Sequence, residues 1–137
     1  MKVVLDTNIW VSAIIWGGIP DEIIMLGQKQ LLTIATSQNL LSELESTLNK
    51  KKIQVKLEAL NLKISSLLSL VRESVILYPI EELNVPQLRD SDDNIVLATA
   101  IASQADVIIT GDKDLLVLEK YQNIQIVTAK DFLQRYF

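Results

Sequence analysis

The chain has 137 residues, of which 49% are apolar and 22% charged, and its net charge is −4. This length and composition predict a single folded domain over residues 1–137 and exclude a disordered chain. The absence of cysteine and histidine excludes disulfides, cysteine zinc sites, thiolate nucleophiles and histidine general bases. Any catalysis must therefore use carboxylates, hydroxyls, lysines or a bound hard cation such as Mg²⁺ or Mn²⁺.

The charge and the N-terminus also restrict partners and location. A net negative charge predicts weak non-specific binding to nucleic acid, although a metal among the acids would offset it and keep a nucleic-acid substrate open. The N-terminus lacks a basic leader and holds Asp6, and the apolar runs are shorter than a membrane span. We therefore expect no signal peptide, no membrane partner and a cytoplasmic location.

Strands and helices are predicted to alternate along the chain. The first half shows patterns for a strand at 2–6, a short helix or loop at 8–16, a helix at 20–28, a strand at 31–35, a helix capped at 36 or 37 that runs to 49, and a long amphipathic helix at 55–72. The second half shows patterns for a strand at 75–78, a loop at 80–89, a helix at 94–104, a strand at 107–110, a short helix at 114–120, a strand at 124–127 and a helix at 129–136, capped by Thr128. This order predicts an α/β fold with a parallel sheet between helices.

Two of the apolar strands end in an aspartate. Asp6 follows the first strand, and Asp112 follows Gly111 after the strand at 107–110. Each could form only an Asx-turn with the backbone two residues on. Because ligands of open α/β sheets bind beyond the carboxyl ends of the strands, the pair is better explained as part of a functional site.

A third group of acids begins the helix before the fourth predicted strand. Asp90, Asp92 and Asp93 surround Ser91, a candidate N-cap, and acids in a first helical turn stabilise it without any other function. Asp114 could likewise cap the helix that follows Asp112. On the helix at 37–49, Glu43 lies between apolar positions, where a carboxylate needs a partner.

Two further features have ordinary explanations. The lysines at 50–52 with Lys56 are more typical of a solvated helix face than of a nucleic-acid patch. Trp10 and Trp16 are better explained as core or partner-facing residues than as base-stacking platforms. The apolar first helix that carries them leaves a homodimer open.

Four motifs in this order resemble the PIN-domain family, in particular the VapC-like toxins of bacterial type II toxin–antitoxin pairs. They are VVLDTN at 3–8, SELES at 42–46, DDNIVLATA at 92–100 and ITGDKDL at 109–115, and the resemblance covers essentially the whole chain. It implies a PIN-like three-layer α/β/α sandwich with a five-stranded parallel sheet, in which the first and fourth strands are neighbours.

The resemblance also implies roles for individual residues. Asp6, Glu43, Asp93 and Asp112 correspond to the family's catalytic, metal-binding acids, and Asn8 and Thr110 to polar residues that orient them. The acid-rich segment at 90–93 leaves open which of its aspartates bind metal, so Asp90, Asp92 and Asp114 are candidate additional ligands.

The function expected from the residues and the resemblance is a ribonuclease dependent on Mg²⁺ or Mn²⁺. It would cut single-stranded or looped RNA into 5′-phosphate and 3′-hydroxyl products, and a cognate antitoxin protein would inhibit it. A phosphatase with an aspartyl nucleophile at Asp6 is disfavoured, because position 8 is Asn and not a second acid. The remaining alternative is a catalytically weak or inactive PIN-like module that binds metal and a protein partner.

Overall fold

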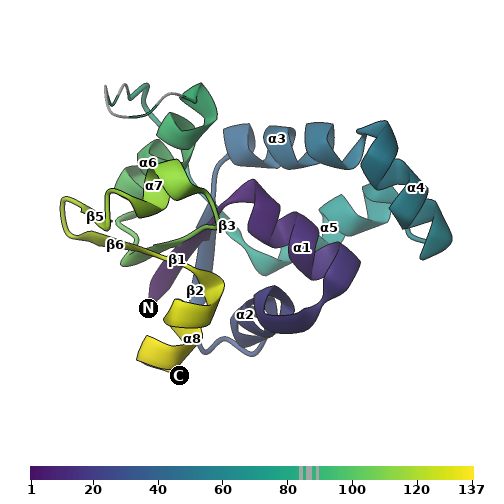
Figure 1. The fold of residues 1–137 in the computed structure, drawn as a ribbon, viewed down its shortest axis with the longest axis horizontal. Helices are drawn as coiled ribbons and strands as arrows, with labels where there is room; N and C mark the ends of the chain where they lie inside the picture. Colours follow the sequence, from purple (N-terminus) through teal and green to yellow (C-terminus); the bar gives the residue numbers. More distant parts are fainter. Residues whose placement is uncertain (84, 86–87, 89) are drawn as a thin grey trace.

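The computed structural model describes residues 1–83, 85, 88 and 90–137, which form one sheet with helices on both faces (Figure 1). The strands are β1 (Lys2–Leu5), β2 (Thr33–Thr36), β3 (Ile76–Leu77), β4 (Val107–Ile109), β5 (Lys120–Tyr121) and β6 (Ile124–Val127). The helices are α1 (Thr7–Trp16), α2 (Gly18–Gln28), α3 (Gln38–Leu48), α4 (Lys51–Ala59), α5 (Ile64–Ser74), α6 (Ser91–Ser103), α7 (Lys113–Leu116) and α8 (Ala129–Tyr136).

The strands lie in the order β3-β2-β1-β4-β6-β5. All neighbouring pairs are parallel except β5 and β6. The predicted α/β fold with a parallel sheet is therefore confirmed, and the predicted neighbours β1 and β4 do pair. The sheet has a sixth strand that the sequence did not reveal, because β5 has only two residues and turns back through Gln122, at φ 53°, into β6.

Each face of the sheet has its own apolar core. Successive strand residues point to opposite faces, so Val3 and Leu5 join one core cluster with α1, α2, α3, α5 and α8, whereas Val4 joins the other with α6. Strands buried on both faces are apolar throughout, which explains the short apolar runs of the sequence.

The predicted long helix at 55–72 is wrong, because the structure has two helices there. α4 ends at Ala59 and α5 begins at Ile64. Between them Asn61 adopts φ 57°, a left-handed conformation that Asn tolerates better than most residues and that ends a helix. Figure 1 shows α4 far from the β5–β6 hairpin, at the opposite end of the molecule.

Most other predicted boundaries agree with the structure to within a few residues, but the short helix predicted at 114–120 ends at Leu116, and Lys120 begins β5. β6 and α8 have the predicted bounds, and the Thr128 hydroxyl accepts from the backbone N–H of Asp131 at 3.1 Å as predicted. The described residues of the predicted loop at 80–89 form no helix or strand; residues 84, 86, 87 and 89 lie outside the described part. Trp10 is a core residue, whereas Trp16 is 72% exposed.

Among the described residues, no single helix has the length and apolar composition needed to cross a membrane. The consecutive helices α1 and α2 meet these two criteria only when taken together, and they are bent by 103° relative to each other.

Candidate metal centre

The carboxyl ends of β1 and β4 meet in the middle of the sheet. β1 pairs with β2 on one side and β4 on the other, and Leu5 lies opposite Ile109. The chain runs outward from β1 through β2 to β3 and later returns as β4 on the other side of β1. Open α/β sheets bind ligands at such a reversal of strand order. Asp6 and Thr110, the residues that follow these two strands, lie at this position.

Asp6 is oriented through both of its carboxylate oxygens. Oδ1 accepts from the backbone N–H of Thr7 at 2.7 Å, and Oδ2 accepts from the hydroxyl of Thr110 at 2.7 Å. The side chain is only 6% exposed. Burial raises the pKa of Asp6, the two hydrogen bonds lower it, and the negative charge of Asp112 raises it further.

The Thr110 hydroxyl connects Asp6 with Asp112. It donates to Asp6 and accepts from the backbone N–H of Asp112 at 3.0 Å. Asp112 is the N-cap of α7, where its Oδ1 accepts from the backbone N–H of Asp114 at 2.9 Å. Thr110 thus has the contacts expected of a residue that orients acids.

Asp93 reaches the same place from the first turn of α6. The N-cap of this helix is Asp90 and not the candidate Ser91, since the Asp90 side chain accepts from the backbone N–H of Asp92 at 2.9 Å. Asp93 is 4% exposed, and its buried Oδ2 has no hydrogen-bond partner within the described structure. Burial, and then the adjacent Asp112, raise the pKa of Asp93 to about 8.

Asp6, Asp93 and Asp112 form a cluster of three carboxylates. One oxygen of each residue lies within 4.8 Å of an oxygen of each of the others. Ionised carboxylates at such separations repel one another, and the unpaired oxygen of Asp93 adds a desolvation cost. A cation would relieve both, and an all-oxygen donor set suits a hard divalent ion such as Mg²⁺ or Mn²⁺. The residues present therefore fit a metal centre.

Glu43 lies close enough to this three-carboxylate cluster to interact with its charges but does not belong to it. The side chain is half-buried on α3. Burial raises its pKa to about 7, and the charges of Asp92 and Asp6 act in the same direction. Thr7 Oγ1 and Glu43 Oε2 are both buried, and neither has a hydrogen-bond partner within the described part of the chain. The unpaired Glu43 oxygen is a second carboxylate atom suited to a cation.

The other predicted site residues lie outside the three-carboxylate cluster. Asp90 and Asp92 are exposed at the start of α6, and Asp92 shares a cleft with Glu43. Asp114 lies in the first turn of α7. The sequence left open that Asp114 caps this helix, but the cap is Asp112. Asn8 is exposed in the first turn of α1 and is not brought into contact with the acids by any described hydrogen bond.

Two positioning contacts were missed from the sequence. The Thr7 backbone orients Asp6, but Thr7 was only part of a motif and nothing singled it out. The hydroxyls of Ser37 and Thr99 are 2.9 Å apart and connect the start of α3 to α6. Since the Thr99 hydroxyl also donates to the carbonyl of Ile95 at 2.8 Å, Ser37 is the donor in this pair. The two residues are 62 positions apart, so no local pattern reveals the contact.

This chain is similar in sequence to known proteins. The profile of the PIN domain matches residues 2–114. An uncharacterized protein of Methanocaldococcus jannaschii, MJ1680, is 35% identical over 145 aligned residues, covering 99% of this chain and 92% of its own.

Two solved structures share the fold. One is VapBC2 from Rickettsia felis bound to a DNA fragment from their promoter, with a TM-score of 0.61 and 18% identity over 92% of this chain and 97% of that one. The other is VapBC-1 from nontypeable Haemophilus influenzae, with a TM-score of 0.60 and 19% identity over 95% of this chain and 99% of that one. The profile match spans most of the chain, and the chain therefore belongs to the PIN-domain family.

Proposed function

We propose that this protein is a metal-dependent endoribonuclease and the toxin of a toxin–antitoxin pair. The observation that carries the proposal is the three-carboxylate cluster at the reversal of strand order, with a buried Asp93 oxygen that lacks a partner. Membership in the PIN-domain family supports nuclease chemistry at this position.

Asp6, Asp93 and Asp112 would hold the cation, with Glu43 completing the set from α3 and Asp90, Asp92 and Asp114 as candidate further ligands. When bound, Mg²⁺ or Mn²⁺ supplies Lewis-acid polarisation of a phosphodiester and stabilises the developing charge. The chain contributes fixed geometry. Thr110 and the Thr7 backbone hold Asp6 in one orientation, and Thr110 also holds the start of α7, which carries Asp112. We assign no such role to the exposed Asn8.

The proposed substrate is single-stranded or looped RNA, because unpaired backbone can enter a cleft edged by helices more readily than a duplex. The proposed protein partner is a cognate antitoxin, which is supported by the shared fold with the two VapBC structures. A homodimer is a further proposed assembly, supported by the exposed apolar side chain of Trp16 at the end of α1.

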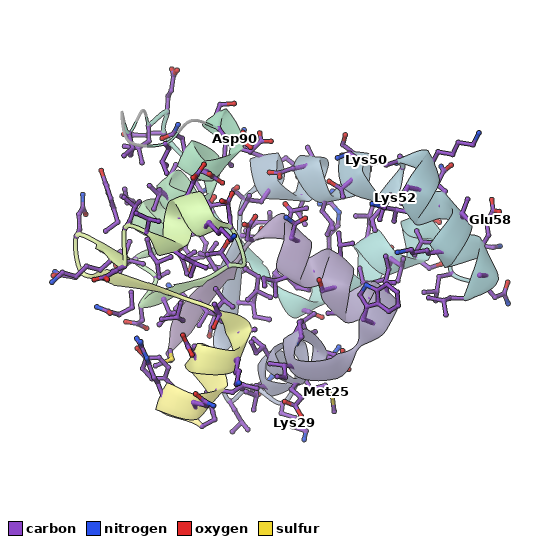
Figure 2. All side chains as sticks on the ribbon, in the orientation of Figure 1. Met25, Lys29, Lys50, Lys52, Glu58 and Asp90 are labelled. Carbon is purple, nitrogen blue, oxygen red and sulfur yellow. The ribbon has the colours of Figure 1, made fainter. Side chains whose placement is uncertain are left out.

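Cleavage of a mixed RNA pool by the purified protein tests the proposal. We expect cleavage with Mg²⁺ or Mn²⁺ that leaves 5′-phosphate and 3′-hydroxyl ends. Chelator or Asp6→Asn should abolish it, while Glu58→Gln should not, because Glu58 is an exposed acid at the far end of α4 (Figure 2). Cleavage that persists in chelator would contradict a metal nuclease.

A thermal melt with Mn²⁺ separates the nuclease from the alternative of an inactive metal-binding module. A cation at 100 times its dissociation constant stabilises the fold by about 2.7 kcal/mol. Both possibilities predict this rise in Tm and its loss in Asp112→Asn. A rise without any RNA cleavage would favour the inactive module.

A further inference from the structure

A cleft runs along α3 from the acids toward the lysines at 50–52. It has a volume of about 510 Å³. Its lining begins with Gln38 and Asn39 at the start of α3, includes Glu43 and the nearby Asp92, and ends at Lys50. Figure 2 shows Lys50 at the end of α3 that is farther from Asp90. The cleft thus includes Glu43 and Asp92, two of the candidate metal ligands, and extends along α3 away from them.

The floor of this cleft is a polar stripe with helical spacing. Gln38, Ser42 and Ser46 are four residues apart and line the cleft from one side of α3. The opposite side of the helix is apolar and buried. Over the seven residues from Glu43 to Lys50 a helix advances about 10 Å. Lys50 follows the end of α3 and is thus displaced from Glu43 along the cleft, which suits a contact with a part of the strand next to the bond that is cut.

The chemistry of the lining favours the backbone of a single strand over its bases. Among the described residues that line the cleft, none is aromatic and Lys50 is the one cation, so stacked bases have no platform and a phosphate has one charged partner. Hydroxyl and amide groups such as those of Ser42 and Gln38 can donate to sugar and phosphate oxygens.

The side chain of Lys50 forms no hydrogen bond or ion pair within the described part of the chain that would explain its position. Lys50 is the N-cap of α4, but its side chain forms no cap hydrogen bond. Lysine is not among the residues preferred at an N-cap, and its charge opposes the dipole of α4 but favours that of α3, whose C-cap is Asn49. The side chain is exposed and can be changed without breaking a described contact.

We infer that this cleft is a subsite for the RNA strand next to the cut, in which Lys50 binds a phosphate that is not the one cleaved. The inference rests on the proposed ribonuclease function. Because Lys50 contacts phosphate and not a base, its contribution does not depend on RNA sequence.

Binding measurements test the subsite directly. Asp93→Asn protein, which should bind RNA without cutting it, is titrated in Mg²⁺ with fluorescent oligo(U) and oligo(A) of equal length over a series of salt concentrations. Adding Lys50→Gln should weaken both complexes several-fold and reduce the slope of log K against log[salt] by about 0.7, the value of one phosphate contact on a single strand. Lys29→Gln is the matched control, since Lys29 is exposed and lies on the other side of the molecule beside α2 (Figure 2).

Kinetics of the otherwise unchanged enzyme give a second readout. Lys50→Gln should raise KM and leave kcat close to its original value, because the lost phosphate contact stabilises the bound substrate and the transition state equally. Lys50→Arg should restore KM. If Lys50→Gln and Lys29→Gln give the same slope and the same KM while RNA is still cut, the subsite is wrong and the ribonuclease stands. If the parent protein neither binds nor cuts RNA, the ribonuclease proposal and the subsite both fail.

Discussion

Asp93 is the residue at which the electrostatic environment of the candidate metal centre is least favourable without a cation. Its carboxylate is buried, one oxygen lacks a hydrogen bond, and Asp112 and Asp6 add negative charge beside it. A residue in this environment destabilises the metal-free fold when it is ionised. A buried carboxylate that destabilises the fold is expected where a ligand binds. Helix capping does not explain Asp93, because Asp90 is the N-cap of α6.

Asp93→Asn should therefore stabilise the metal-free protein while it abolishes RNA cleavage. The amide has nearly the same shape, carries no charge and can donate to a neighbouring carboxylate. We expect a gain of about 1 kcal/mol, or roughly 3–5 °C in Tm, at about pH 8.5 in chelator, where the native carboxylate is largely ionised. Glu58→Gln should leave the melt unchanged. A clear drop in Tm for Asp93→Asn would mean that the residue serves the stability of α6 instead.

At the scale of elements, the sequence predicted the strands that carry the site because each is a short apolar run that ends at a recognisable residue. Asp6 and Asp112 were found for this reason. The break between α4 and α5 was missed because Asn61 interrupts an otherwise continuous amphipathic pattern by a backbone conformation and not by a glycine or proline. The distance of Glu43 from the other acids could not be predicted, since it depends on how α3 packs against α6.

The hydrogen bond between Ser37 and Thr99 joins the start of α3 to α6, and Thr99→Val should remove it. The Ser37 hydroxyl then loses its acceptor while it stays buried, which should cost about 1–3 kcal/mol. Because the start of α3 is no longer held to α6, RNA cleavage should fall as well.

A double-mutant cycle with Ser37→Ala isolates this contact from the cap that Ser37 provides to α3. Urea unfolding of the four proteins should give a coupling of about 0.5–1.5 kcal/mol. Additive losses would show that the two hydroxyls do not stabilise each other.

At the scale of the whole molecule, the site exists because of strand order. The order places β1 beside β4, and the segments that follow these strands contribute Asp6 and Asp112 to the cluster. Asp93 comes from the first turn of α6, which packs on one face of the sheet. Local patterns contain no information on strand order, so the neighbouring position of β1 and β4 was predicted from the family resemblance alone. The same arrangement couples the protonation of the site to folding of the entire chain.

The free energy of unfolding of the metal-free protein should fall as the pH rises from about 4 to about 8. In the fold, Asp93 and Glu43 have pKa values of about 8 and about 7, against ordinary values of 3.8 and 4.5. Between these values the folded chain retains protons that the unfolded chain has released, so raising the pH favours unfolding. Urea unfolding in chelator across this range would measure the slope, which Asp93→Asn should reduce. Saturating Mn²⁺ should oppose the fall, because a cation binds the deprotonated carboxylates. A stability that rises throughout this range would contradict the burial of protonated acids at the centre.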